Sequence, residues 1–306
     1  MQKCGRQDKQ VPGDEIKDET LKSAYSAGME RLRQSGVPEA DLDAWYLLEY
    51  VTGISRSSYY MEPDRKMSVW QRARYEECLS RREQRIPLQH ITGEQEFMGL
   101  TFLVDENVLI PRQDTEILVE QALEILKTET LPQCDGKTLF LDMCTGSGCI
   151  LLSVLHYAGR MGKRVEGTGS DLSEKALDIA KQNAGALGIR AEFICGDLFA
   201  NIRGKYSMIL SNPPYIRSSD IDALQEEVRL HDPREALDGK EDGLYFYRRI
   251  TDEAREYLLP GGCLIFEIGY DQAEDVSALM NSARYTEIRV KKDLAGLDRV
   301  VCGRYS

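Results

Sequence analysis

The sequence predicts an α/β protein: a small all-helical N-terminal domain, a β-hairpin linker, and a doubly wound, mostly parallel β-sheet. A chain of 306 residues is long for one domain and suits two. Between residues 17 and 88 the apolar residues recur at helical spacing, whereas from residue 138 short apolar runs alternate with helical segments. Such alternation is typical of a parallel sheet with helices on both faces.

The N-terminal part predicts three helices after a polar, aperiodic stretch, residues 1–16, which we expect to be a flexible tail. The three expected helices are 21–34, 38–52 and 68–85. Gly36 and Gly53 are placed to end the first two, and Pro38 suits the first turn of the second. In the third, the positions expected to be buried are Val69, Ala73, Cys78 and Leu79.

Pro87 interrupts the helical pattern and begins the connection between the domains. Gln95 to Val104 predicts two short strands around Met98-Gly99, a hairpin within a linker at 89–112. The second domain, 113–306, then opens with a helix that Asp114 is expected to cap. Its alternating strands and helices are expected at 138–143, 149–157, 165–169, 173–187, 191–195, 206–210, 243–259 and 263–268.

Charge and composition restrict the classes of function. With 39 Lys and Arg against 51 Asp and Glu, the formal net charge is -12, which argues against binding nucleic acid by phosphate neutralisation. A local excess of basic residues at 65–85 is read as a solvated helix face, although it could instead bind ribosomal RNA or an acidic protein. No apolar stretch approaches the roughly 18 residues of a membrane span, and no apolar signal region follows Met1, so we expect a cytoplasmic protein without a membrane partner.

The distribution of cysteines and histidines in the sequence predicts the redox compartment and whether a metal site is expected. The eight cysteines are scattered without a CxxC pair and are expected to be small buried thiols in a reducing compartment. The three histidines are not grouped with cysteine or carboxylate at ligand spacing, so we expect no metal site.

The stretch Leu139 to Ile150 predicts a strand, a turn of small residues from Cys144 to Gly148, and a helix start. In doubly wound folds a ligand lies beyond the carboxyl ends of the strands, and glycines there allow close approach to the backbone. Asp171 follows the next strand about 25 residues after Gly146, where a carboxylate can accept hydrogen bonds from ribose hydroxyls.

These residues do not by themselves identify the ligand. Asp197-Leu198, after the third strand, could face a base with one polar and one apolar residue. NAD is the alternative, since the same acid would serve it. Against NAD, Leu151 stands where the third glycine of G-x-G-x-x-G would fall.

The run Tyr206 to Leu210 predicts a buried strand that ends in Ser211-Asn212-Pro213-Pro214-Tyr215. Proline fixes its own φ and disfavours the α region for the preceding residue, so we expect a stiff, extended strand end rich in acceptors. Taken alone, the two prolines could be merely a loop breaker.

Together these residues resemble the class I S-adenosylmethionine-dependent methyltransferases, from about Gln113 to the C-terminus. The Asn-Pro-Pro-Tyr motif narrows the resemblance to members that methylate a planar nitrogen: an exocyclic amine of adenine or guanine, or the amide of glutamine. In this family the acceptors for the two N–H groups are the asparagine oxygen and the next carbonyl, here Asn212 and Pro213. Pairing both N–H groups orients the nitrogen lone pair without a strong base, and Tyr215 would stack on the planar group.

Further motifs resemble the HemK/PrmC proteins, which are peptide chain release factor N5-glutamine methyltransferases. These motifs are Ile91-Thr92-Gly93-Glu94, Glu96-Phe97-Met98-Gly99, Val108-Leu109-Ile110-Pro111-Arg112, Asp114-Thr115-Glu116, Pro233-Arg234-Glu235-Ala236-Leu237, Asp242-Gly243-Leu244 and Phe266-Glu267-Ile268-Gly269. The family implies a helical substrate-recognition domain, here 17–88, and a substrate that is the Gly-Gly-Gln glutamine of bacterial class 1 release factors. We expect a monomer without a direct nucleic-acid substrate.

The resemblance also implies the site residues. S-adenosylmethionine, which leaves as S-adenosylhomocysteine, is expected at Asp142, Cys144, Thr145, Gly146, Ser147, Gly148, Asp171, Asp197, Leu198 and Asn212. The substrate is expected at Asn212, Pro213, Pro214, Tyr215, Arg112 and Glu116. Asn212, Pro213 and Tyr215 are the expected catalytic residues.

Purely structural roles remain open for several of these side chains. Asp142 could cap a helix or form a turn, Asp171 could cap the helix at Ser173, and Asp197 could be a loop residue. Arg112 and Glu116 could form a surface ion pair.

Two positions depart from the family pattern. Cys144 replaces the usual first glycine of Gly-Thr-Gly-Ser-Gly, and Gln113 replaces a usual proline. If position 144 requires a positive φ, its side chain costs about 1 kcal/mol or more.

Two rival functions remain. The same chemistry could act on a nucleic-acid base, although such enzymes usually carry a basic groove. A non-catalytic adaptor for translation factors could retain the fold without the reaction.

Overall fold

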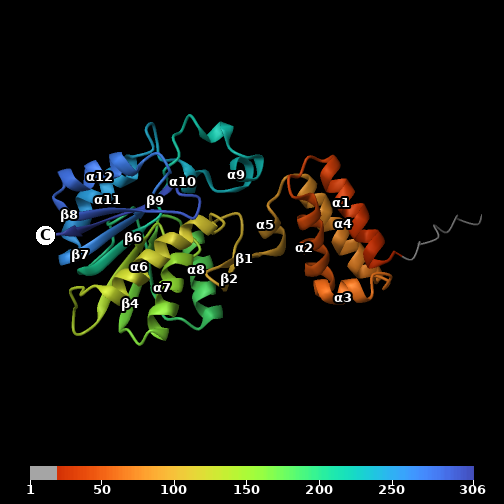
Figure 1. Cartoon of the computed structure of the whole chain (residues 1–306), viewed down its shortest axis with the longest axis horizontal. Coiled ribbons are helices and arrows are strands. Elements are labelled where there is room, and N and C mark those ends of the chain that lie inside the picture. Colours follow the sequence, from red (N-terminus) through yellow and green to blue (C-terminus); the bar gives the residue numbers. More distant parts are fainter. Residues whose placement is uncertain (1–18) are drawn as a thin grey trace, which may run out of the picture. The chain divides into compact units, whose positions relative to one another are not determined.

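The computed structural model describes residues 19–306, so the tail predicted at 1–16 lies outside the described residues. The chain forms two compact units that divide between Leu88 and Gln89. The first unit is helical, and the second contains the hairpin and a seven-stranded sheet (Figure 1).

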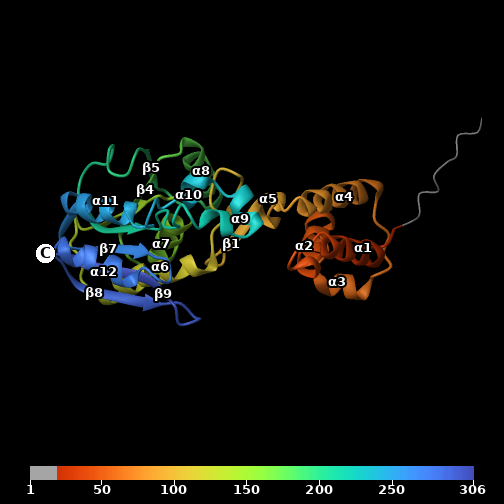
Figure 2. The ribbon, with the colours of Figure 1, turned by 90° about the horizontal axis from the view of Figure 1, so that it is seen from above.

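The first unit contains the helices α1 (Leu21–Gln34), α2 (Ala40–Thr52), α3 (Arg56–Met61) and α4 (Val69–Glu83), which form one bundle (Figure 2). Thr20 and Ser68 cap α1 and α4 through reciprocal hydrogen bonds with the residue three positions on. Gly53 ends α2 in the left-handed conformation, as its position predicted. The helix α3, which Ser55 caps, was not predicted because six residues carry too little periodicity.

The buried face of α4 differs from the predicted one. Tyr75, Cys78 and Leu79 are buried as one stripe, whereas Val69 is 67% exposed and Ala73 is also exposed. The basic face is not fully solvated either, because Arg82 is buried and its Nε donates to Asp43 Oδ2 at 2.7 Å. This pair lies inside the bundle, where an ion pair requires close geometry.

The second unit contains all but the first residue of the short helix α5 (Leu88–Thr92), followed by the antiparallel strands β1 (Glu94–Phe97) and β2 (Leu100–Leu103). Side chains of the sheet domain hold this hairpin. Met98 N–H donates to Glu116 Oε1 at 2.6 Å, and Tyr157 donates to the Met98 carbonyl. Asn183 bonds both backbone groups of Leu103.

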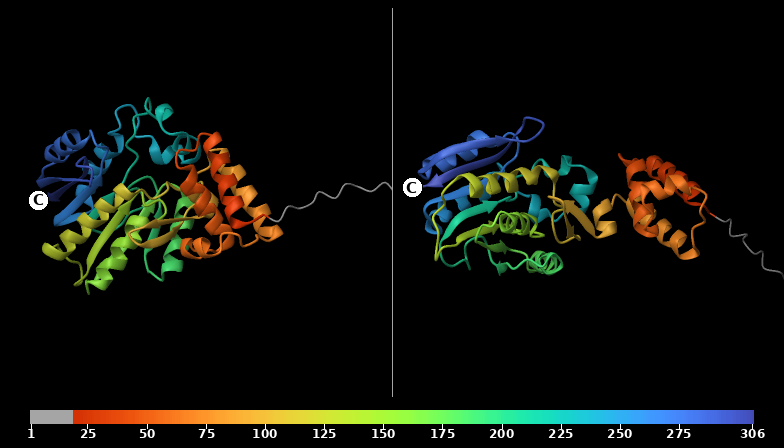
Figure 3. Two further views of the ribbon diagram at one scale, coloured as in Figure 1. Left: turned by 45° about the vertical axis from the view of Figure 1, so that its right-hand side comes forward. Right: turned by 60° about the horizontal axis from the view of Figure 1, so that its bottom comes forward.

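The large sheet has the order β5-β4-β3-β6-β7-β9-β8. Its strands are β3 (Thr138–Met143), β4 (Val165–Asp171), β5 (Glu192–Cys195), β6 (Tyr206–Ser211), β7 (Leu258–Glu267), β8 (Tyr285–Lys292) and β9 (Asp298–Tyr305). The first five run parallel, and β9 pairs antiparallel with both β7 and β8. This confirms the doubly wound, mostly parallel fold; β8 and β9, at one edge (Figure 3), were not predicted.

Helices cover both faces of this sheet. One face carries α6 (Glu116–Thr128), α7 (Cys149–Arg160) and α8 (Glu174–Leu187); the other carries α11 (Tyr245–Glu253) and α12 (Ala273–Ser282). Neighbouring strand residues point to opposite faces: Phe140 joins the core under α6 and α7, and Leu141 joins the core under α11 and α12. Both faces are therefore buried, which suits the apolar runs in the sequence.

The remaining short elements are η1 (Gln113–Thr115), η2 (Ile221–Ala223), α9 (Glu226–His231), α10 (Arg234–Leu237) and η3 (Ala254–Glu256). The prediction that Asp114 caps a helix was wrong. A 3-10 turn precedes α6, the cap position falls on Thr115 without a side-chain hydrogen bond, and Asp114 instead pairs with Arg299 at 3.1 Å.

Candidate active site

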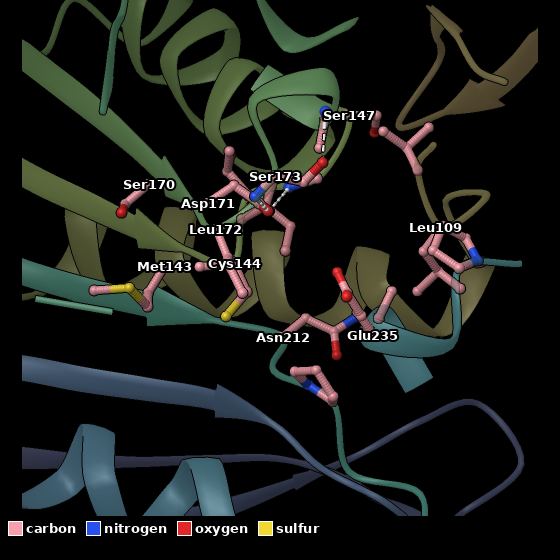
Figure 4. Close-up of a pocket in the computed structure, with 18 of the residues that line it drawn as sticks. Leu109, Met143, Cys144, Ser147, Ser170, Asp171, Leu172, Ser173, Asn212 and Glu235 are labelled. Carbon is pink, nitrogen blue, oxygen red and sulfur yellow. Dashed lines mark hydrogen bonds between the residues drawn. The ribbon is translucent and has the colours of Figure 1, made fainter. Parts of the chain in front are cut away.

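A cavity lies at the carboxyl ends of the parallel strands (Figure 4). Its empty space is about 1090 Å³, counting the part that opens to solvent. The segments that follow β3, β4, β5 and β6 all contribute to its walls, because the ends of parallel strands meet at one edge of a sheet. This is where the sequence placed the ligand.

The turn between β3 and α7 forms one wall. Cys144, Gly146 and Gly148 all have positive φ, at 63°, 54° and 79°. A Cβ at Gly148 would also lie 3.2 Å from the Ala180 side chain of α8, so this glycine is required by both conformation and packing. The turn therefore lies tight against α8.

Asp142 holds this turn from behind. Its Oδ2 accepts hydrogen bonds from Thr145 Oγ1 at 2.5 Å and from the Leu151 N–H at 3.2 Å. The side chain is fully buried, and burial raises its pKa to about 7, although the two hydrogen bonds oppose the shift. Its role as a turn former, one of the alternatives left open by the sequence, is thus seen directly.

Asp171 links the turn to β4. Its Oδ2 accepts from the Gly146 N–H and its Oδ1 from the Ser173 N–H, both at 2.9 Å. Burial raises the pKa of Asp171, and these backbone bonds oppose the rise. Ser173, not Asp171, is the residue that caps α8 with its side chain. Figure 4 shows Asp171 facing the cavity beside Leu172 and Ser173.

Asp197 and Leu198 follow β5 on the next wall. Leu198 is buried, with a φ of 50°, while Asp197 is exposed and pairs with Arg249 Nη1 at 2.9 Å. The cavity thus has one apolar and one acidic contribution here, and the expectation that these two residues face a base stays a prediction.

The segment after β6 supplies Asn212. Ser211 Oγ donates to the Met143 carbonyl at 2.8 Å, and Asn212 Nδ2 donates to Thr115 Oγ1 at 3.3 Å. Downstream, Gln272 Nε2 donates to the carbonyls of Tyr215 and Gly243. These bonds fix the strand end on both sides of the two prolines.

The predicted site residues separate into two groups. Those in the cavity wall are Arg112, Cys144, Thr145, Gly146, Ser147, Asp171, Asp197, Leu198, Asn212 and Pro214. Those outside the wall are Asp142, Gly148, Pro213, Tyr215 and Glu116. Tyr215 packs against the core beneath α11 and α12, so its stacking role stays a prediction. Glu116 and Arg112 do not pair with each other as the open alternative supposed; Glu116 binds the hairpin and Arg112 pairs with Asp232.

A second part of the cavity wall consists of residues for which the sequence predicted no role in the site. Its residues are Asn107, Val108, Leu109, Pro111, Thr115, Pro233, Glu235, Ala236 and Phe246. Most belong to motifs on which the family resemblance rested, but nothing in the sequence says that residues 107–115 and 233–236 face the glycine turn.

Among the described residues no group of three or more His, Cys, Asp or Glu is arranged to hold a metal ion. Within the same part of the chain, no helix is both long enough and apolar enough to cross a membrane. The seven cysteines of residues 19–306 are free, and Cys134 is exposed although burial was expected.

Two family models match separate parts of the chain. Residues 23–93 match the PrmC N-terminal domain family, and residues 118–243 match the methyltransferase small domain family. The release factor glutamine methyltransferase of Caulobacter vibrioides is 40% identical over 287 residues, covering 93% of this chain and 96% of that protein. The enzyme of the same name from Agrobacterium fabrum is 38% identical over 289 residues, covering 94% and 98%.

Solved structures are similar at the level of the fold. The hMettl16 catalytic domain aligns with a TM-score of 0.52 at 12% identity, covering 77% of this chain and 82% of that one. A methyltransferase from Pyrococcus furiosus aligns with a TM-score of 0.50 at 16% identity, covering 74% and 99%.

Proposed function

This chain belongs to the release factor glutamine methyltransferase family, and from that premise we propose that it methylates the glutamine side chain of the Gly-Gly-Gln loop in bacterial class 1 peptide chain release factors. The proposed methyl donor is S-adenosylmethionine. The observation that supports both most strongly is the convergence of the glycine turn, Asp171 and Asn212 on one cavity.

The cavity fits a polar, nucleoside-like donor. Among the residues that the structure describes, the Ser170 hydroxyl in the cavity wall is buried without a hydrogen-bond partner, and Asp171 offers carboxylate lone pairs beside exposed Leu172. When bound, S-adenosylmethionine supplies an electrophilic methyl group and leaves as S-adenosylhomocysteine. The residues proposed to hold it are those of the turn from Cys144 to Gly148, together with Asp171, Asp197, Leu198 and Asn212, with Asp142 acting from behind the turn.

Asn212 and Pro213 are proposed to position the substrate amide. An amide nitrogen is a poor nucleophile because its lone pair is delocalised. Two rigid acceptors, Asn212 Oδ1 and the Pro213 carbonyl, would hold both N–H groups and turn the lone pair towards the methyl group. The N–C bond formed in this reaction would replace the S–C bond of the donor, and one N–H proton would leave to solvent. Pro214, Arg112 and Glu116 complete the proposed substrate-binding set, with Tyr215 proposed to stack.

We also propose that the helical unit, residues 17–88, recognises the release factor, with residues 89–112 as linker and 113–306 as the catalytic domain. The protein is proposed to act as a cytoplasmic monomer without a direct nucleic-acid substrate. The net charge of -12 and the free cysteines support this setting.

The substitution Asn212→Ala tests the proposal. Because it removes one acceptor for the substrate amide, we expect methyl transfer to be abolished while the affinity for S-adenosylmethionine changes by only a few-fold. Mass spectrometry of an unmethylated release factor treated with each enzyme would detect one added methyl on the loop glutamine, and calorimetry would measure cofactor binding. Normal turnover by Asn212→Ala would contradict the mechanism, and label from the cofactor found only in added nucleic acid would contradict the substrate.

A further inference from the structure

A buried carboxyl group lies next to Asn212 at the end of the sheet. Strands β6 and β7 pair in parallel with Ser211 opposite Phe266, so the residues that follow, Asn212 and Glu267, emerge side by side. Glu267 is 2% exposed and does not line the cavity. Glu267 belongs to the motif Phe266-Glu267-Ile268-Gly269, which contributes no residue to the cavity wall.

Thr115 joins these two side chains. Asn212 Nδ2 donates to Thr115 Oγ1 at 3.3 Å, and both residues line the cavity. The carboxyl of Glu267 lies beside the same pair: burial raises its pKa, and the Thr115 hydroxyl and the Asn212 carboxamide both oppose that rise. Among the described residues, its Oε2 has no hydrogen-bond partner. Glu267 therefore lies on the protein side of the Asn212 carboxamide.

The two ends of a carboxamide have nearly the same shape but opposite hydrogen-bonding character. A carboxylate can only accept, so a buried carboxylate behind Asn212 favours the orientation in which the amino end turns inward. The oxygen Oδ1 is then left to the cavity. A substrate amide nitrogen offers only N–H donors, so the reversed carboxamide would set donor against donor.

We propose that Glu267 is a positioning residue which, with Thr115, fixes the Asn212 carboxamide so that Oδ1 faces the substrate nitrogen. This inference rests on the proposed function, since it concerns the orientation of the acceptor for the glutamine amide.

Protonation of Glu267 should remove this preference. The titratable and charged groups around it are Arg299 of β9, Asp114 of η1, Cys149 of α7, Tyr247 of α11 and Tyr215. Burial raises the pKa of Cys149 to about 12 and also raises that of both tyrosines, so these three stay neutral near pH 7.

Burial raises the pKa of Glu267 to about 7. Below that pH the carboxyl is protonated and has an O–H donor as well as an acceptor oxygen. It is then compatible with either orientation of the Asn212 carboxamide. The turnover number should therefore rise as the pH rises through about 7. Asp142 titrates in the same range, but its contribution is common to the wild type and to variants at position 267.

The variant Glu267→Gln keeps the shape and adds a donor. With an unmethylated class 1 release factor as substrate, we expect kcat at pH 8 to fall by about tenfold or more, because a misplaced acceptor is costly in a positioning mechanism. KM and cofactor affinity should change by less than about threefold, as for an interaction that acts mainly in the transition state. The rise of kcat with pH should flatten.

Thr115 provides a second pair of variants. Thr115→Val removes the hydroxyl and should lower kcat as Glu267→Gln does, whereas Thr115→Ser restores the hydroxyl and should recover most of the kcat that Thr115→Val loses. Because the two residues act through one network, the double variant should lose little more than the more damaged single variant. The exposed Glu256, replaced by Gln, controls for the loss of one negative charge.

The outcomes separate this inference from the proposed function. If the wild type adds no methyl to the release factor, the proposed function fails and this inference fails with it. If the wild type methylates while Glu267→Gln or Thr115→Val retains its kcat and pH profile, the inference alone is overturned. Melting temperature and calorimetric cofactor binding establish that each variant is folded.

Discussion

Cys144 has a left-handed backbone, with a φ of 63°, at the first position of the turn that faces the cavity. The sequence raised this question, because a positive φ strains any residue with a Cβ by about 1 kcal/mol or more. The cost is offset in part by packing, since the side chain contacts the core under α11 and α12. Burial also raises the pKa of the thiol, so it stays protonated and acts as a small apolar group.

Replacing Cys144 by Gly and by Ala should separate strain from packing. Both variants lose the sulfur contact, but only glycine relieves the backbone, so Cys144→Gly should be more stable than Cys144→Ala by about 1 kcal/mol. Chemical denaturation monitored by circular dichroism measures the difference.

Cys149 supplies the matched control. It is also buried, but it starts the helix α7, where glycine is less favourable than alanine by roughly 0.5–1 kcal/mol. The order of stability should therefore reverse at position 149. The same order at both positions would show that backbone strain does not distinguish Cys144.

At the scale of elements, the long connection between β6 and α11 forms part of the cavity wall. It contains α9 and α10 and brings Pro233, Glu235 and Ala236 to the cavity. One ion pair joins it to the segment before η1: Arg112 Nη2 lies 2.6 Å from Asp232 Oδ2, whose side chain is fully buried. Removing the arginine would leave a buried carboxylate without its cation, which is costly.

We expect Arg112→Gln to loosen this connection. Amide hydrogen exchange across α9 and α10 should accelerate, because the buried Asp232 loses its charged partner. Affinity for the release factor should also fall, since Arg112 is part of the proposed substrate-binding set.

Arg217→Gln is the control within the same connection. Its partner Asp271 is exposed to the same extent as Arg217, at 42% for each side chain, and exposed pairs contribute only about 0–1 kcal/mol. Exchange in α9 and α10 should stay at the wild-type rate. Equal acceleration in both variants would mean that the buried pair does not hold the connection.

At the scale of the whole molecule, the carboxyl edge of the sheet carries two fully buried acids, Asp142 and Glu267, whose pKa burial raises to about 7. A carboxyl whose pKa is higher in the folded state binds a proton more readily there than in the unfolded chain. Its contribution to stability is therefore full below pH 4 and is lost as the pH rises through 7. The active site thus carries a stability cost at neutral and higher pH.

Glu267→Gln should show this cost directly. Relative to the wild type, its free energy of unfolding should increase as the pH is raised from 5 to 8, with a limit on the order of 3 kcal/mol for a shift from 4.5 to about 7. Denaturation at each pH measures the difference. A difference that stays constant with pH would contradict the raised pKa of Glu267.

Local patterns in the sequence predicted much of the molecule correctly. The periodicity of 21–34 and the apolar runs at 138–143 and 206–210 each predicted the type of element that formed there. Gly53 and the Cys144 to Gly148 turn act through neighbouring backbone, so their positions were readable from a few residues. The family could also be identified from the sequence, because each motif on which the resemblance rests is a short, continuous stretch of chain.

What only the tertiary structure decided depends on residues far apart in the sequence. Arg82 is buried where it forms an ion pair with Asp43, and Asp114 forms an ion pair with Arg299 instead of capping a helix. Residues 107–115 and 233–236, far apart in the sequence, both line the cavity. Glu267 was visible as part of a motif, but its proximity to Asn212 follows from the pairing of β6 with β7. Local preferences act within a few residues, whereas burial and charge pairing depend on which distant segments the fold brings together.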